Sequence, residues 1–177
     1  MNLSKLSSKE LFAHLAEIGV LLRTRNITRS SNNVVGDLAE SLFCQAYKWK
    51  LADNSQRGFD AVDKKTGNRY QIKGRRCIGK DKSHMLGAIR NLNDKDKPFD
   101  FLAVVIFSKD YEIAYAALIK YALVEQKATK LQTHTNSRRF ILNQDCKETG
   151  VQDVTEKLRA DATALLRTSK GFPDLPR

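Results

Sequence analysis

Cysteine is scarce in this chain, and long apolar runs are missing. The 177 residues include only three cysteines, Cys44, Cys77 and Cys146, an odd number at wide separations. No two of them have the spacing of a zinc-binding knuckle, which argues against both a zinc site and a disulfide framework. The longest apolar runs, 101–107 and 113–119, hold seven residues each, whereas a membrane-spanning helix needs ~20. We therefore expect no membrane partner.

The motifs of several enzyme classes and of secretion are also missing. The first residues lead into a polar segment and not into the apolar core of a signal peptide. The chain has no Gly-x-Ser-x-Gly nucleophile elbow, no phosphate-binding P-loop and no dinucleotide-binding glycine pattern. We therefore expect a cytoplasmic protein whose chemistry does not depend on those motifs.

Acidic residues are outnumbered by basic ones. The chain has 31 Lys and Arg against 20 Asp and Glu, a formal net charge of +11, and its isoelectric point is about 9.7. Attraction to a polyanion is expected at this charge, and nucleic acid is the first candidate. The alternative is a solvated surface whose charge has no specific partner.

The hydrophobic pattern predicts one α/β domain over residues 1–177, with an N-terminal helical extension over 1–30 and a loose tail over 171–177. Hydrophobic residues make up 41% of the chain, enough for one core. Ser7 and Glu10 have the spacing of a capping box at the start of the first helix. The predicted helices are 8–22, 34–48, 85–92, 121–130 and 153–168. The predicted strands are 58–63, 68–73, 100–107, 112–119 and 139–142, with a basic loop at 75–82.

A β-hairpin is predicted where the period changes to two. Residues 58–63 and 68–73 alternate, and Lys64-Lys65-Thr66-Gly67 separates them as a turn. If Asp63 faces Asn68, then Asp60 faces Gln71 across the ribbon. The face that we expect to meet the core carries Phe59, Ala61, Tyr70 and Ile72. The other face carries Asp60, Val62, Gln71 and Lys73.

The polar face of this hairpin has the groups that a magnesium site needs. Carboxylate and carbonyl oxygens suit Mg²⁺ or Mn²⁺, so Asp60 and Gln71 are candidate ligands and the backbone carbonyl of Ile72 is a further one. Lys73 lies two residues along the strand on the same side. Its ammonium could orient a water molecule or neutralise charge that develops on a phosphate.

These residues resemble the motif of the PD-(D/E)xK restriction-endonuclease-like nuclease superfamily. The resemblance rests on Glu40 in a preceding helix, on Gly58-Phe59-Asp60, and on Gln71-Ile72-Lys73. It implies an αβββαβ core with a mixed central sheet flanked by helices. It also implies a metal-dependent nuclease site formed by Glu40, Asp60, Gln71 and Lys73, with Glu40 as a third metal ligand.

Gln71 departs from the family pattern, which has Glu or Asp at this place. A Gln here is similar to the Mrr-like restriction branch, and its neutral oxygen leaves the site with one negative charge fewer. Glu40 could offset this loss, and Asp37 lies three residues earlier on the same helix face. The alternative interpretation is an ordinary half-exposed ribbon with polar residues on its wet face.

Two groups of basic residues are candidates for DNA contact. The segment that leaves the second hairpin strand contains Arg75, Arg76, Lys80 and Lys82, which could contact backbone phosphates without reading sequence. His134, Asn136, Arg138 and Arg139 form a second cluster before a predicted strand. For each group the alternative is a solvated surface.

Three functions remain open at this point. The first is a Mg²⁺-dependent DNA endonuclease, restriction-type or acting in DNA repair or on junctions. The second is a DNA-binding module on the same fold whose turnover is weak or lost because of Gln71. The third is a structural or interaction protein. One site per chain cuts one strand, so cleavage of both strands would favour a homodimer, and the first helix is a candidate surface for it.

Overall fold

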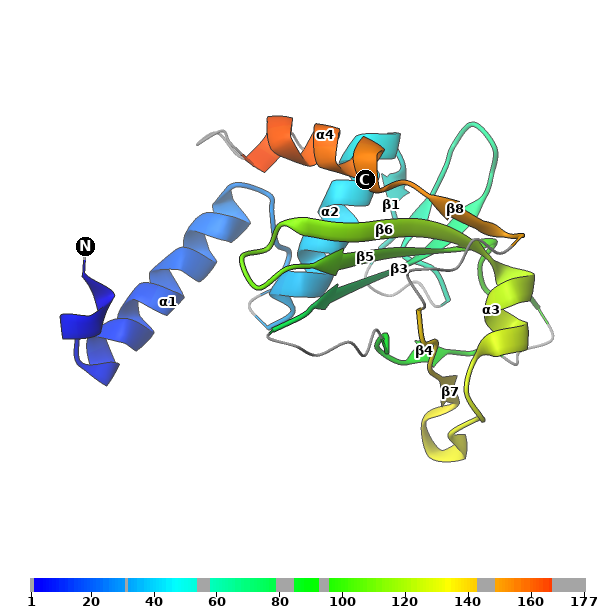
Figure 1. Cartoon of the computed structure of the whole chain (residues 1–177), viewed down its shortest axis with the longest axis horizontal. Helices are drawn as coiled ribbons and strands as arrows, with labels where there is room; N and C mark the ends of the chain where they lie inside the picture. Colours follow the sequence, from blue (N-terminus) through cyan, green and yellow to red (C-terminus); the bar gives the residue numbers. More distant parts are fainter. Residues whose placement is uncertain are drawn as a thin grey trace.

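A six-stranded mixed sheet lies at the centre of the protein (Figure 1). The computed structural model describes residues 2–30, 32–53, 58–78, 85–92, 96–142 and 149–166, with the side chains of 164–166 left aside. The strands run in the order β1 (Lys50–Leu51), β2 (Ala61–Val62), β3 (Arg69–Arg76), β5 (Phe101–Phe107), β6 (Ile113–Lys120) and β8 (Val151–Asp153). Only β3 and β5 are parallel neighbours. The predicted single α/β domain with a mixed sheet is confirmed.

Strand β5 is buried on both faces, as its uninterrupted apolar sequence predicts. Its residues alternate between two cores. Ala103, Val105 and Phe107 belong to one cluster, and the neighbouring Leu102, Val104 and Ile106 belong to the other. The strand therefore divides the interior into two layers, one on each side of the sheet.

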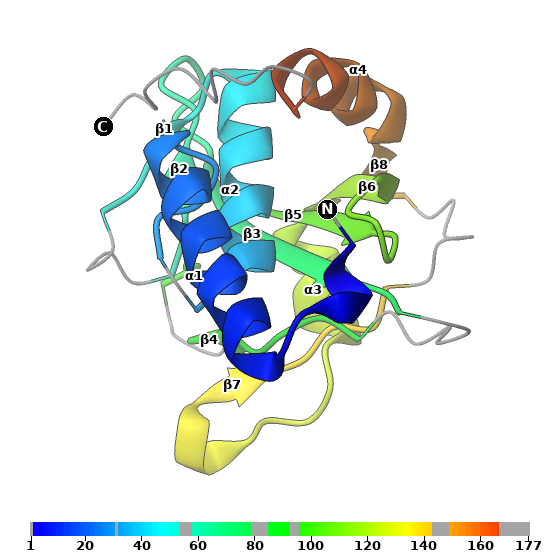
Figure 2. The ribbon, with the colours of Figure 1, turned by 90° about the vertical axis from the view of Figure 1, so that its left-hand side faces the viewer.

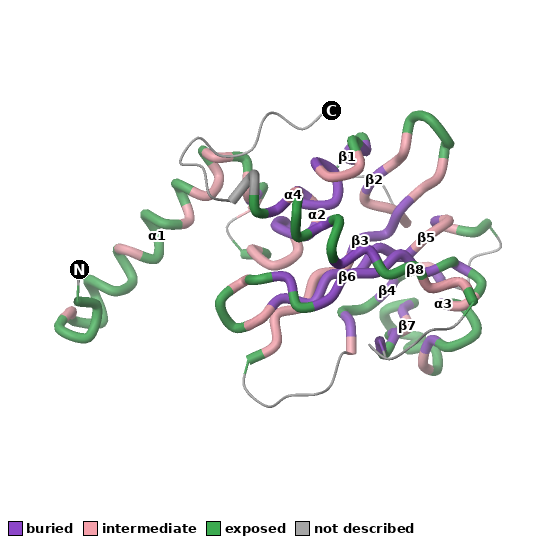
Figure 3. Tube along the Cα trace, turned by 45° about the horizontal axis from the view of Figure 1, so that its top comes forward, coloured by how far each residue is buried: buried purple, intermediate pink, exposed green. Residues whose placement is uncertain are grey.

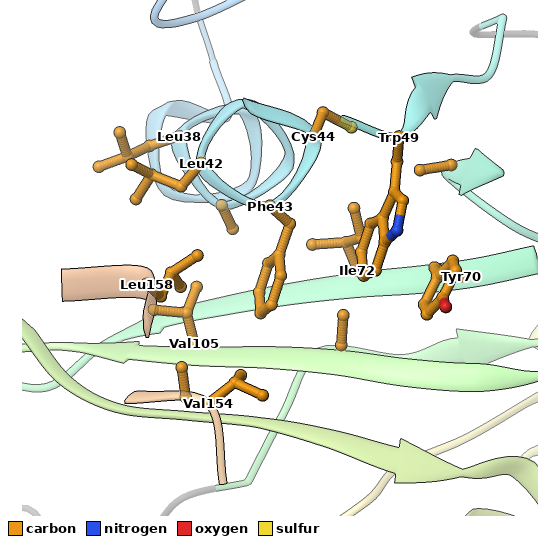
Figure 4. Close-up of a cluster of buried hydrophobic side chains, with 14 of the residues drawn as sticks. Leu38, Leu42, Phe43, Cys44, Trp49, Tyr70, Ile72, Val105, Val154 and Leu158 are labelled. Carbon is orange, nitrogen blue, oxygen red and sulfur yellow. The ribbon is translucent and has the colours of Figure 1, made fainter. Parts of the chain in front are cut away.

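Helices α2 (Val34–Tyr47) and α4 (Thr155–Leu166) cover the first face (Figures 1 and 4). Phe43 of α2 and Leu158 of α4 are fully buried over Ile72 and Val105 of the sheet. Trp49, just after α2, stacks on Tyr70 of β3 with ring centroids 3.6 Å apart. These contacts attach α2 firmly to the strand that carries the predicted site residues.

The second face is covered by helix α3 (Tyr121–Lys127) and by a separate two-stranded sheet. This small sheet pairs β4 (Ile89–Arg90) with β7 (Ser137–Arg138). A single turn of 3-10 helix, η2 (Thr133–Thr135), precedes β7 in a loop that projects away from the main sheet (Figures 1 and 2).

A glycine sets the distance between α2 and β3. A Cβ atom at Gly74 would lie 2.7 Å from the Val35 carbonyl oxygen and 2.9 Å from the Ala39 Cβ. Both are closer than a side-chain carbon approaches in folded proteins. The helix can therefore lie against this part of the strand only because residue 74 has no side chain.

Helix α1 (Ser8–Thr24) extends away from the other elements (Figures 1 and 3). The predicted capping box is confirmed, because the Ser7 side chain accepts a hydrogen bond from the Glu10 N–H and the Glu10 carboxylate accepts one from the Ser7 N–H. The helix, which follows the short 3-10 helix η1 (Leu3–Lys5), has no buried residue (Figure 3). Its exposed large apolar side chains are Leu11, Phe12, Leu15, Ile18, Val20 and Leu21. None of the described helices is long and apolar enough to cross a membrane.

Two predicted elements around the sheet are wrong. Residues 85–92 are not helical, because Ile89 is buried in strand β4, which pairs with β7, and Met85 bridges to Ile141. The predicted loop at 75–82 begins too early, because β3 continues to Arg76, where it pairs with Phe107 of β5.

The last part of the chain and one core residue also differ from the predictions. Residue 153 ends strand β8 instead of opening the last helix, which begins at Thr155. The short strand predicted at 139–142 lies at 137–138. Phe59 packs against the cluster of the second face, whereas Ala61, Tyr70 and Ile72 belong to the first, as predicted. The predicted tail at 171–177 lies outside the described residues.

Candidate active site

The candidate site lies at the edge of β3, at the point where its neighbour β2 ends. Strand β2 pairs with β3 only through Ala61 with Tyr70 and Val62 with Arg69. The next amide of β3 on the side of β2, the Ile72 N–H, donates instead to the carboxylate of Asp60 over 2.6 Å. A side chain thus takes the place of a strand, and the edge of β3 beyond Tyr70 is not covered by β2.

Asp60 and Gln71 meet across this edge, as the predicted register requires. The Ala61–Tyr70 pairing is the predicted one, and it brings the Gln71 side chain to Asp60. The Gln71 amide donates its N–H to the same carboxylate oxygen of Asp60 that accepts the Ile72 N–H. Because the amide nitrogen is used in this way, the amide oxygen is the end of Gln71 that could bind a cation.

Gln71 and Lys73 face a cavity of about 560 Å³. Both side chains point to the second face of the sheet, because residues two apart on a strand share a side. Arg90 and Asn91, at the end of β4, line the same cavity. The cavity therefore combines the predicted lysine with two further hydrogen-bonding residues that the sequence does not predict. No short-range pattern links residues 90 and 91 to the hairpin.

Glu40 reaches the same neighbourhood from α2. Its side chain is 13% exposed, and its pKa is raised from 4.5 to about 7. Burial is the main cause, and the nearby carboxylate of Asp60 raises the pKa further. The structure therefore brings Glu40 close enough to Asp60 for the two acidic groups to influence each other. The contact of Glu40 with the Arg29 guanidinium lowers the pKa, but it does not outweigh these two effects.

Arg29 and Asp37 were not predicted as a pair, and both have defined roles. One oxygen of Asp37 accepts hydrogen bonds from the Arg29 N–H over 2.8 Å, from the Ser30 N–H over 2.6 Å and from the Ser30 hydroxyl over 2.9 Å. Asp37 thus holds the loop before α2 and places Arg29 on Glu40. A role for Asp37 as a metal ligand is not favoured, since these three donors already occupy one of its carboxylate oxygens.

The predicted DNA-contacting arginines of β3 and β7 are largely engaged within the fold. The Arg75 guanidinium donates to the Met85 carbonyl. The Arg76 guanidinium donates to the Lys109 carbonyl and lies over the Tyr111 ring, 4.3 Å from its centroid. These two side chains therefore stabilise the end of β3 and its surroundings, so a role in phosphate contact would compete with those bonds.

The second basic cluster is divided between structural and exposed residues. The Arg138 guanidinium donates to the Thr129 and Ala128 carbonyls, each over 2.7 Å. Arg139 and His134 are exposed. Lys80 and Lys82, the remaining predicted contacts, lie outside the described residues.

The donor atoms of the site suit a hard divalent cation in type, although they are few. Among the described residues no three His, Cys, Asp or Glu side chains gather as a metal-binding group. The site instead offers the carboxylates of Asp60 and Glu40 with the neutral oxygens of Gln71 and Ile72. Mg²⁺ commonly keeps several water ligands and needs only one or two protein carboxylates, so this set of oxygens fits it.

Comparison with known proteins adds no assignment. No protein-family model and no curated protein sequence matches the chain. The function must therefore be argued from the arrangement of the site itself.

Proposed function

We propose that this protein is a Mg²⁺- or Mn²⁺-dependent DNA endonuclease, of the restriction type. The observation that carries the proposal is the meeting of Asp60 and Gln71 at the open edge of β3, beside the cavity that Lys73 lines. Glu40 approaches the same edge from α2. An acid, a second acid, an amide and a lysine gathered at a strand edge beside a cavity match the needs of phosphodiester hydrolysis.

Each residue has a distinct part in this proposal. Asp60 and Glu40 bind the cation, and Gln71 holds Asp60 in place through its N–H while its oxygen is available as a ligand, with the Ile72 carbonyl as a further one. Lys73 holds the attacking water in position and stabilises the negative charge that develops on the phosphate. When bound, the cation lowers the pKa of a water molecule and screens the scissile phosphate.

The arrangement of the elements partly supports a restriction-endonuclease-like core. Helix α2 precedes β1, β2 and β3, and the site residues occupy the helix and the two strands of the hairpin in the order that the resemblance implies. The connection from β3 to the parallel strand β5 differs, because its described part contains β4 where the αβββαβ order has a helix. The proposal therefore rests on the site more than on the topology.

A DNA-binding module with weak or lost turnover is the second candidate. It is favoured by one observation, the presence of only two carboxylates among the proposed ligands. A nuclease of DNA repair or of DNA junctions would use the same residues, and the substrate would distinguish it. A cytoplasmic location remains a prediction from the sequence.

Plasmid nicking in Mg²⁺ or Mn²⁺, with EDTA as the blank, tests the proposal. Lys73→Ala should lower the nicking rate by about 100-fold or more while divalent-ion and DNA binding persist. Asp60→Asn should abolish Mn²⁺ binding in calorimetry. Lys65→Ala and Asp53→Asn, at exposed positions, are the matched controls.

Two results would contradict the proposal. Nicking by Lys73→Ala at the wild-type rate would exclude the catalytic role of the hairpin. Metal binding and DNA binding without any nicking by the wild type would instead favour the inactive module.

A further inference from the structure

The loop at residues 129–139 is a closed and projecting unit on the second face. The Thr129 N–H donates to the Arg139 carbonyl over 2.8 Å, and the Arg139 N–H donates to the Thr129 hydroxyl over 2.9 Å. Nearer the tip, the Gln132 N–H donates to the Ser137 carbonyl over 2.9 Å. Figures 1 and 2 show the loop, in yellow, reaching away from the main sheet. It is therefore a shaped protrusion, held at its base and again near its tip.

The surface of this loop carries no negative side chain. Positions 126–142 contain four Lys and Arg and no Asp or Glu. Every residue from 130 to 136 is exposed. Apart from Leu131, those residues all bear hydrogen-bonding side chains: Lys130, Gln132, Thr133, His134, Thr135 and Asn136. Such a surface suits a partner that offers both negative charge and hydrogen-bonding edges.

The loop is directly connected to the candidate active site. Strand β7, at the end of the loop, pairs with β4 through Arg90 and Ser137. The Asn91 N–H donates to the Asn136 carbonyl over 3.0 Å, and the Asn136 amide donates to the Asn91 side-chain oxygen over 3.2 Å. Arg90 and Asn91 also line the cavity that contains Lys73. A ligand that lay in the cavity and extended past Asn91 would therefore meet the loop.

We propose that the loop at 129–139 inserts into a groove of duplex DNA beside the scissile phosphate. This proposal rests on the nuclease function proposed above. Lys130 and Arg139 contact phosphates, and His134 faces base edges. A major groove about 12 Å wide admits a two-stranded ribbon, whereas the major groove of duplex RNA is too narrow for side chains. The loop has no Phe, Tyr or Trp, so it lacks the large aromatic platform on which single-strand binders stack successive bases.

Binding of uncleaved duplex DNA in EDTA, followed by fluorescence anisotropy, tests the proposal apart from catalysis. Lys130→Ala/Arg139→Ala should weaken binding about tenfold and lower the slope of log K against log salt by about 2, the value for two phosphate contacts. Lys64→Ala/Lys65→Ala removes the same charge from the turn between β2 and β3, which is also exposed. This control should change binding much less.

The role of the tip and the kind of duplex that binds are tested by two further measurements. His134→Ala should alter the preference among sequences of a randomised duplex without a change in the salt slope. A duplex RNA of the same sequence should bind more weakly than the DNA. Circular dichroism and the unfolding temperature of each variant verify that it is folded.

Four results would overturn the proposal. The first two are an equal loss of DNA affinity in the loop and control variants, and wild-type DNA affinity in the loop variant. The third is equal affinity for duplex RNA and duplex DNA. The fourth is no DNA binding by the wild type, which is expected if the loop binds an acidic protein instead. Failure of the nuclease function is distinguishable, because loop-dependent DNA binding without nicking leaves the loop assignment intact.

Discussion

Gln71 has a structural reason to be an amide. Its N–H and the Ile72 N–H converge on one oxygen of Asp60, and an ionised glutamate could not donate there. The residue is 7% exposed, so water would not readily replace the missing donor. The amide of Gln71 therefore holds the metal-free arrangement together, and a carboxylate at position 71 would disrupt this arrangement.

Gln71→Glu should make the stability of the protein depend on metal. In EDTA we expect a loss of about 1–3 kcal/mol, because a buried hydrogen bond is replaced by repulsion from Asp60. Mg²⁺ should bind more tightly than to the wild type and restore stability, with nicking retained or modestly reduced. Thermal unfolding and calorimetric titration measure both effects, with Gln126→Glu on the exposed side of α3 as the control. Equal unfolding temperatures for both variants in EDTA would contradict the role given to Gln71.

Glu40 should make stability and metal binding depend on pH. Its pKa is about 7 in the folded protein and 4.5 as the ordinary value. Between these values the folded protein holds a proton that the unfolded chain has released, so stability falls as pH rises through this window and levels off above it. Metal binding should strengthen over the same window, because the ligand must lose that proton.

Glu40→Gln tests this assignment. In EDTA, the free energy of unfolding declines between pH 5 and pH 8, and in the variant this decline should be smaller by on the order of 1–2 kcal/mol. Urea unfolding measures it. It should also show a flatter pH dependence of Mn²⁺ affinity. Glu112→Gln, at an exposed position, should behave as the wild type does. Identical pH profiles for wild type and Glu40→Gln would contradict the high pKa.

At the scale of elements, the close contact of α2 with β3 is the feature that places Glu40. Gly74→Ala puts a methyl group against the Val35 carbonyl and Ala39, so the helix must move outward. We expect a loss of roughly 1–3 kcal/mol in stability and weaker Mn²⁺ binding. Gly87→Ala is the matched control, because nothing lies within 4 Å of the added carbon. A Gly74→Ala variant with unchanged metal affinity would show that the helix position does not matter to the site.

Elements with a strong local pattern could be predicted from the sequence, and those that depend on distant partners could not. The hairpin register followed from the turn and the alternation, so the Asp60–Gln71 contact was predictable. The local pattern of residues 85–92 predicts a helix, yet Ile89 pairs with residue 138, far along the chain. The contact of Arg29 with Glu40 depends on how Asp37 folds the loop before α2. No spacing of residues signals it.

At the scale of the whole molecule, α1 stands out because most of its large apolar side chains are exposed. Its apolar residues Leu11, Leu15, Ile18 and Leu22 recur at the spacing of a coiled-coil seam, and no residue of the helix is buried. Most of the stability of a helix in a protein comes from the packing of its apolar face. A second copy of the chain would cover this face and bring two sites to one duplex.

We expect a concentration-dependent dimer in light scattering. Leu15→Asp should weaken it at least tenfold, because it places a charge on the apolar face. Ala13→Asp adds the same charge at an exposed position about 200° around the helix, and it should leave the dimer in place. A wild type that stays monomeric while it cuts both strands, without pairing on DNA, would contradict the dimer.

The parallel pairing of β3 with β5 also sets the moment at which the site can exist during synthesis. Every proposed catalytic residue lies before position 76, yet β3 has two paired positions with β2 and seven with β5. Strand β5 ends at Phe107, 31 residues after β3 ends. At ~5–20 residues per second, a ribosome needs roughly 2–6 s to supply the strand that holds Gln71 and Lys73 in place. A nascent chain therefore carries the whole motif for seconds before it can act on DNA.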